Sequence, residues 1–265
     1  MKKIFLLLAL VFCGGTAHAD TSPLPVEITA AKSLEWNRKA KTYVARENVV
    51  ATQGAIRIQS DFLTARYTDD KGMTDISTLE AEGHVVIRSP PYTATGDKAV
   101  YDVMTGNAVM TGEDLKIVTD ADIMTAEDKI EFFGSENRLT ATGRATVTRS
   151  TDGVISADAL DAWFVKDATG RMTVSSVTAR KHVVVKTAKE TATGDSGVYD
   201  VPAQKAVLTG KVKIFQGENR LEGTRAEVDM TTGMSRLSGE GNLETEGRVR
   251  GVFYPNSQKR KDKKQ

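Results

Sequence analysis

The side chains best suited to metal binding or proton transfer are His84 and His182 and the aspartates Asp102 and Asp200. The histidines occupy matching places in two similar segments, and neither has Cys, His or acidic residues at the spacing of a metal site. Each aspartate follows a tyrosine, and the two are again equivalent, whereas acid and base catalysis needs groups in unlike environments. We therefore expect no metal, no cofactor and no catalytic residue, and we interpret the aspartates as turn residues at strand ends.

These equivalences come from an internal repeat. Thr93 to Gly112 returns as Thr191 to Gly210 with 13 of 20 positions identical and an offset of 98. With one slip of a residue, the two copies extend over about 54–149 and 152–247. Because neither copy has a plausible catalytic or metal-binding group, the repeat extends a β surface and a continuous core instead of a catalytic site. This favours a function that depends on an extended surface.

The first residues have the pattern of a secretory signal peptide. Lys2 and Lys3 precede an apolar run that ends in small residues and Ala17-His18-Ala19, so we predict a signal over residues 1–19. The run is shorter than the roughly 20 apolar residues of a membrane-spanning helix. The single cysteine, Cys13, lies inside this signal after bulky Phe12, which disfavours lipidation. The rest of the chain would then fold in the periplasm without a disulfide.

The charge of the chain is nearly balanced, with 36 Lys and Arg residues against 35 Asp and Glu residues. Basic residues gather only in Lys259–Lys264, within a segment, 256–265, that lacks apolar residues and that we predict to be a disordered tail. Without a basic stripe in the body or aromatic residues for stacking on bases, the sequence does not indicate nucleic-acid binding.

Short alternating runs predict half-buried β-strands. Turn signals containing Gly, Asn or Asp separate these runs, and the mature chain has no sustained helical period. We therefore expect an all-β, antiparallel fold built from repeated hairpins. Examples of the runs are Ile56 to Ile58, Val85 to Ile87, Ile123 to Thr125, Val183 to Val185 and Val212 to Ile214.

One motif resembles the LptA (OstA) family of periplasmic lipopolysaccharide transport proteins. It is the stretch from Val207 to Gly223, with Gln216-Gly217 between two strands, continuing through Val228-Asp229 to Gly233. Glu47 to Gly54 and the following Ser60 to Asp69 look like an earlier copy. The resemblance extends over about 26–252 and makes residues 20–255 a single domain of this type.

The resemblance implies an elongated, open β-jellyroll with acyl chains lying between its two layers. The implied function is periplasmic, non-enzymatic transport that shields the lipid A acyl chains and bridges components of the two membranes. Implied partners are an inner-membrane LptC-like jellyroll at the N-terminal edge and an outer-membrane LptD-like receptor at the C-terminal edge, with self-association at high concentration.

An apolar trough is needed for such a ligand, and the alternating strands suggest which side chains line it. The predicted lining residues are Ile56, Ile58, Phe62, Val85, Ile87, Val100, Met110, Ile117, Ile123, Ile130, Phe132, Leu139, Val183, Val185, Val198, Leu208, Val212, Ile214, Leu221, Val228 and Leu237.

Other interpretations of the pattern stay open. The apolar rows are also compatible with a closed sandwich core. A secreted β-helix that binds or cleaves polysaccharide is a second possibility, although the hairpin turns disfavour it, and a membrane-tethered LptC-like component is a third. Trp163 and Phe164 break the symmetry of the repeat, and we interpret them as core-filling residues rather than a ligand platform.

Overall fold

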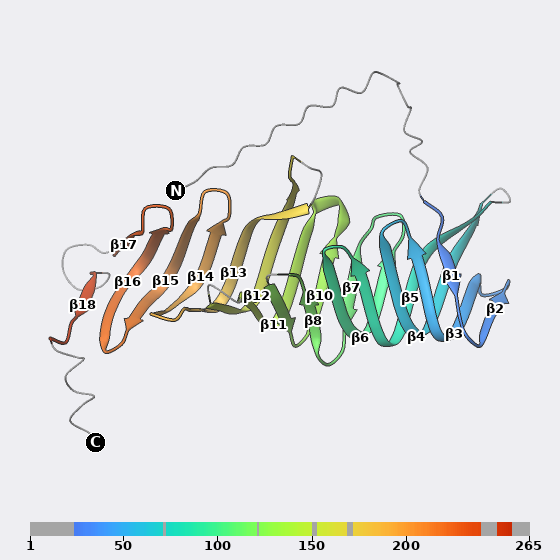
Figure 1. The fold of residues 1–265 in the computed structure, drawn as a ribbon, viewed down its shortest axis with the longest axis horizontal. Helices are drawn as coiled ribbons and strands as arrows, with labels where there is room; N and C mark the ends of the chain where they lie inside the picture. Colours follow the sequence, from blue (N-terminus) through green and yellow to red (C-terminus); the bar gives the residue numbers. More distant parts are fainter. Residues whose placement is uncertain are drawn as a thin grey trace, which may run out of the picture.

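The computed structural model describes residues 24–70, 73–120, 122–149, 153–168, 172–239 and 248–255. These residues form one 18-stranded sheet in which every strand pairing is antiparallel. The molecule is elongated, and its strands follow one another along the long axis from β1 and β2 at one end to β17 and β18 at the other (Figure 1). The predicted all-β antiparallel fold is confirmed, and the antiparallel pairing disagrees with a parallel β-helix.

The strands differ widely in length. Their bounds are β1 Glu27–Thr29, β2 Ser33–Asn37, β3 Thr42–Gln53, β4 Ile56–Asp70, β5 Met73–Ser89, β6 Tyr92–Asp102, β7 Ala108–Thr111, β8 Leu115–Val118, β9 Asp122–Ala126, β10 Lys129–Phe133, β11 Arg138–Arg149, β12 Gly153–Lys166, β13 Met172–Lys186, β14 Thr191–Asp200, β15 Lys205–Gln216, β16 Asn219–Asp229, β17 Met234–Ser238 and β18 Arg250–Val252. A short 3-10 turn, η1 (Gly134–Glu136), joins β10 to β11.

Each long strand bends near its middle, where the pairing register shifts. The shift lies between Arg46 and Val49 in the β3–β4 pair, and similar shifts recur in seven further pairs. Such bulges bend the strand locally. The sheet is thereby folded along its length into two layers, and we call the line of bends the corner.

The two layers are identified most easily by the short strands. Layer A contains β1, β8, β9 and β18, and layer B contains β2, β7, β10 and β17, while the other long strands run through both. This division is clearest at β6, which pairs with β8 in layer A and with β7 in layer B. The hairpin turns of each layer form a rim on the side opposite the corner.

Aspartates support the corner at regular intervals. Several corner glycines have a positive φ, and a Cβ built on them would lie within 2.6 Å of an aspartate atom on the neighbouring segment. In one of these places the backbone N–H of Glu113 donates to Oδ2 of Asp97 at 2.7 Å. The pairs are Gly83 with Asp61, Gly112 with Asp97, Gly143 with Asp128 and Gly210 with Asp195.

The two repeated histidines lie at this corner. His84 and His182 both have a positive φ, of 46° and 48°. Their Nδ1 atoms lie 2.6 Å from Asp61 and 2.9 Å from Asp158, respectively. The hydrogen bond with Asp61 raises the pKa of His84. Within the described ranges no three His, Cys, Asp or Glu residues are grouped to hold a metal ion.

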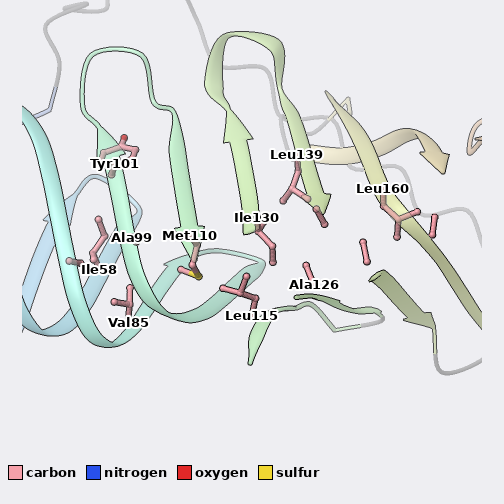
Figure 2. Packing of buried hydrophobic residues seen from close by; sticks show 14 of the residues in the cluster. Ile58, Val85, Ala99, Tyr101, Met110, Leu115, Ala126, Ile130, Leu139 and Leu160 are labelled. Atoms are coloured by element: carbon pink, nitrogen blue, oxygen red, sulfur yellow. The ribbon is translucent and has the colours of Figure 1, made fainter. Parts of the chain in front are cut away.

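The core lies between the layers and is densest beside the corner. The largest fully buried side chains are those of Leu63, Leu115, Leu160, Val49, Val85, Val183 and Val212, and all of them flank a bend. Burying one such side chain contributes about 1.5–3 kcal/mol. Figure 2 shows Val85, Leu115 and Leu160 among the buried apolar side chains that reach into the space between the strands. The partly buried apolar residues lie farther toward the rims.

Some predicted features lie outside the described residues, namely the signal peptide at 1–19 and the basic tail at 256–265. Of the described residues, none belongs to a helix long and apolar enough to cross a membrane. Within the proposed repeat, residues 98 apart occupy the same corner positions, as His84 and His182 do. The boundaries of the repeat stay a prediction.

The corner makes a prediction about stability. Gly210 has a φ of +77°, and an added Cβ would lie 2.4 Å from Oδ2 of Asp195. Gly210→Ala should therefore lower the free energy of unfolding by at least about 2 kcal/mol, through left-handed strain and displacement of Asp195. Gly217→Ala is the control, because Gly217 has a φ of +61° but open space around it. Urea unfolding that gave equal losses for the two variants would contradict a special role of the corner.

Candidate apolar binding cavity

A cavity of about 810 Å³ lies between the layers, lined by residues of strands β4 to β13. Among the described residues, the lining side chains are mainly aliphatic and aromatic, and none of them is charged. Layer A contributes Ile56, Ile58, Ile87, Ala94 and Ile117, and layer B contributes Tyr101, Ala108, Met110, Ile130, Phe132 and Leu139. A cavity of this size and lining suits an uncharged, apolar ligand group.

The cavity exists because the two layers diverge from the corner. Close to the bends the space is filled by the protein's own side chains; a Cβ on Gly96 would lie 2.8 Å from both Leu115 and Met110. Farther out, Ile56, Ile87 and Ile117 are only partly buried. The interior is thus a closed core at the corner and an open space toward the rims.

Two contacts join the layers across this space. At the rim, Tyr92 meets Phe164 edge to face with ring centroids 5.7 Å apart, and its hydroxyl donates to the carbonyl oxygen of Met172 at 3.4 Å. From layer B, the Tyr101 hydroxyl donates to Oε1 of Gln53 in layer A at 3.1 Å. Burial raises the pKa of both tyrosines, as expected for phenols in apolar surroundings.

The structure brings most of the predicted lining residues between the layers. Eight of them line the cavity: Ile56, Ile58, Ile87, Met110, Ile117, Ile130, Phe132 and Leu139. Seven more belong to the core or pack against it: Val85, Val183, Val185, Leu208, Val212, Ile214 and Leu237. Two more, Leu221 and Val228, are paired with Ile214 and Ala206 between β15 and β16. Directly paired residues lie on the same face of a sheet, so Leu221 faces inward with Ile214.

Four predicted lining residues are placed on the outer surface instead. Phe62 lies under the guanidinium of Arg46 at 4.6 Å. Val100, Ile123 and Val198 are 45%, 40% and 46% exposed. The inward positions on their strands belong to neighbours, such as Leu63 beside Phe62 and Met124 beside Ile123.

The corner explains three of these four corrections. In β4, Ile56 and Ile58 point inward, but the bulge between Gln59 and Phe62 adds one residue. Alternation then resumes with Leu63 inward and Phe62 outward, because a shift of one residue exchanges the two faces of a strand. The same shift turns Val100 and Val198 outward. Ile123 lies on the short strand β9, whose pairings show no register shift, and there the predicted alternation placed the wrong face inward.

Sequence reasoning missed the aromatic and small residues of the cavity. Tyr92, Tyr101 and Phe164 line it, together with Ala94 and Ala108. Tyr101 directly precedes Asp102, a predicted turn residue, and alternation without a bulge would place it outward. The one-residue shift at Asp97 makes it face inward. Phe164 packs against the core and also lines the cavity, so its assignment as a core-filling residue rather than part of a ligand site stays a prediction.

The two aspartates considered for proton transfer form hydrogen bonds that support turns. Asp102 Oδ1 accepts a hydrogen bond from the backbone N–H of Thr105 at 2.8 Å, and this bond lowers the pKa of Asp102. Asp200 Oδ1 accepts from Ala203 N–H at 2.9 Å. The prediction that both aspartates are turn residues at strand ends is therefore confirmed.

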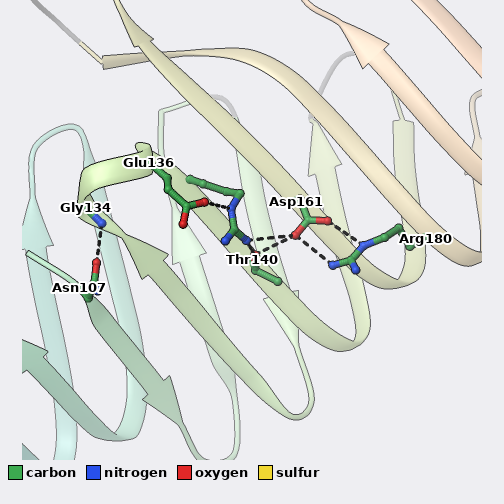
Figure 3. Close-up of polar contacts among 7 residues, drawn as sticks. Asn107, Gly134, Glu136, Thr140, Asp161 and Arg180 are labelled. Atoms are coloured by element: carbon green, nitrogen blue, oxygen red, sulfur yellow. Dashed lines mark hydrogen bonds and ion pairs between the residues drawn. The ribbon is translucent and has the colours of Figure 1, made fainter.

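The most buried carboxylate, Asp161, lies on the outer face of layer B, where β11, β12 and β13 meet. It is 5% exposed and accepts hydrogen bonds from Thr140 Oγ1 at 2.8 Å and Arg180 Nε at 2.8 Å. Arg138 donates to Thr140 at 2.7 Å and to Glu136 at 2.7 Å. Figure 3 shows this chain of contacts. Because its charges are mutually compensated, we interpret the cluster as a support for three strands.

The cavity leads to a binding prediction. Ala108→Trp places a large ring inside the cavity, so the affinity for an apolar fluorescent dye such as N-phenylnaphthylamine should fall by roughly fivefold. Val100→Trp adds the same ring on the exposed outer face of β6 and should leave dye affinity unchanged. Equal dye binding by the two variants, measured by fluorescence titration, would show that the dye does not occupy this cavity.

Two known proteins are similar to parts of this chain. An uncharacterized protein of Rhizobium meliloti (strain 1021) is 28% identical over 151 residues, which are 55% of this chain and 77% of that protein. The crystal structure of LptH, the LptA homologous periplasmic component of the lipopolysaccharide transport device of Pseudomonas aeruginosa, has 14% identity and a TM-score of 0.23, covering 88% of this chain and 96% of that one.

A family model matches the chain twice, over residues 27–138 and 128–234. Its description is the LptA and LptD N-terminal domain lipopolysaccharide transport protein. Together the two matches cover most of the chain, including every residue that lines the cavity. This chain belongs to the LptA and LptD N-terminal domain family, a family of lipopolysaccharide transport proteins rather than enzymes.

Proposed function

We propose that this protein carries lipopolysaccharide through the periplasm by sheltering lipid A acyl chains between its two layers. The observation that carries the proposal is the cavity of about 810 Å³ between the layers, whose described lining residues are all uncharged. The lipid is bound without covalent change, and its polar part stays outside the space between the layers.

The energetics favour a long apolar interior for this cargo. Each methylene withdrawn from water contributes about 0.8 kcal/mol, so one chain of about a dozen carbons needs on the order of 10 kcal/mol of shelter. The cavity walls supply this with side chains such as Ile58, Ile117 and Phe132. Beyond the cavity, Val185 and Ile214 continue the inward apolar rows into the second half.

We further propose that the two ends of the sheet dock unlike partners. Both ends are edges with unpaired backbone groups, which either need protection or recruit another strand. Exposed apolar residues accompany them: Leu34 and Trp36 at the β2 end, 54% and 52% exposed, and Phe253 near β18, 67% exposed. An inner-membrane LptC-like jellyroll would extend the first edge and an outer-membrane LptD-like receptor the second.

If the lipid lies between the layers, photo-crosslinking to it should depend on whether the modified residue faces inward or outward. A photoreactive residue at Ile117 or Ile214, which face inward, should trap lipopolysaccharide in cells. The same residue at the neighbouring Lys116 or Lys213 should give only background labelling, because adjacent strand residues face opposite sides. Ile123 now belongs with the background positions. Similar labelling at both classes would refute an interior path for the lipid.

The docking assignment predicts two different crosslinked proteins. A photoreactive residue at Leu34 should capture an inner-membrane jellyroll, and one at Phe253 should capture an outer-membrane receptor. Met104, 74% exposed in a turn of the middle region, is the control and should capture neither. Capture of the same partner from both ends would argue against a bridge between unlike components, and capture of this chain alone would indicate self-association instead.

A further inference from the structure

An unusual pair of arginines lies on the outer face of layer A. Arg57 in β4 and Arg88 in β5 are direct partners across the two strands, and both are exposed. Like charges placed directly opposite each other in a sheet are destabilising. In the described parts of β3 to β16, eight other arginines each form an ion pair with a carboxylate, whereas these two have no such partner among the ion pairs of the structure.

The surroundings do not neutralise the pair. Arg88 donates to Oε1 of Gln59, which helps to orient its guanidinium. In the row of paired residues across the strands, Arg57 is paired with Thr52, and Thr52 is paired with Glu27. Glu27 is the nearest acidic residue in this row on that side. Glu27 and Arg57 are two strand spacings apart, about 10 Å, and they are not among the ion pairs of the described residues. On the other side, the partner of Arg88 is Thr93.

The position of the pair connects it to the cavity. Arg57 lies between Ile56 and Ile58, and Arg88 lies between Ile87 and Ser89; all four of these neighbours line the cavity. The arginines therefore stand on the back of the same wall. Arg88 is two residues from Pro90 at the rim, a distance of about 7 Å along the strand.

We infer that Arg57 and Arg88 form an anion-binding site for a phosphoryl group of the lipid whose acyl chains occupy the cavity. Two adjacent guanidinium groups match the geometry of a phosphate, which accepts paired hydrogen bonds from arginine. A bound phosphoryl group also relieves the repulsion between the two cations. The inference rests on the proposed function and adds the polar end of the same ligand.

The test measures binding of two lipids to the full chain, by calorimetry at about 0.1 M salt. One lipid is phosphorylated lipid A, and the other is the same lipid after enzymatic removal of its phosphates. The Arg57→Gln and Arg88→Gln double variant should bind phosphorylated lipid roughly tenfold more weakly than the wild type and bind the dephosphorylated lipid equally well. The control is Lys186→Gln with Lys213→Gln, which removes the same charge from the second half of the same face and should change neither affinity.

The possible results separate the two claims. If the wild type bound neither lipid, the proposed function would be wrong and the inference with it. If the wild type bound both lipids but the double variant lost nothing, or lost no more than the control, the cargo assignment would stand and the anion site would be refuted. An equal loss of affinity for both lipids in the double variant would also refute the anion site. So would tight binding of inorganic phosphate at the pair without any effect of the substitutions on lipid affinity.

Discussion

The bend in the middle of each long strand is the constraint on which the rest of this structure depends. On alternate strands, among them β5, β11 and β15, the bend contains residues with a positive φ, such as Gly83, Gly143 and Gly210, a conformation that glycine adopts most easily. Neighbouring aspartates stabilise these bends, as Asp97 does for the N–H of Glu113. Because the bends line up from strand to strand, one continuous sheet becomes two facing layers.

The binding cavity follows from that geometry. Two layers joined at a corner enclose a wedge, so apolar side chains such as Leu63 and Leu115 fill its narrow part completely. Toward the rims the same kinds of side chain no longer meet, and the space between Ile56 and Leu139 remains open. Cross-layer contacts, such as Tyr92 against Phe164 and Tyr101 with Gln53, hold the layers at this separation. The space between the layers is thus a packed core near the corner and a ligand cavity nearer the rims.

The sequence was sufficient to predict the antiparallel class, the family and many inward residues, because alternation within each half-strand is regular. Ile56, Ile58, Val85 and Ile87 follow it directly. It failed for Phe62, Val100 and Val198, since each lies beyond a bulge that reverses the face. Repeated glycines such as Gly112 and Gly210 carried a signal for those bends. The cross-layer partners of Tyr92 lie some 80 residues away, and no local pattern encodes such a distance.

The most direct test of an interior lipid path is methyl NMR of the full chain with and without lipopolysaccharide. Ile58 and Ile117 face the cavity, whereas Ile123 and Val100 lie on the outer surface. The account predicts large chemical-shift changes for the methyl groups of Ile58 and Ile117 and little change for those of Ile123 and Val100. Unchanged signals from Ile58 and Ile117, with shifts confined to the outer residues, would contradict it.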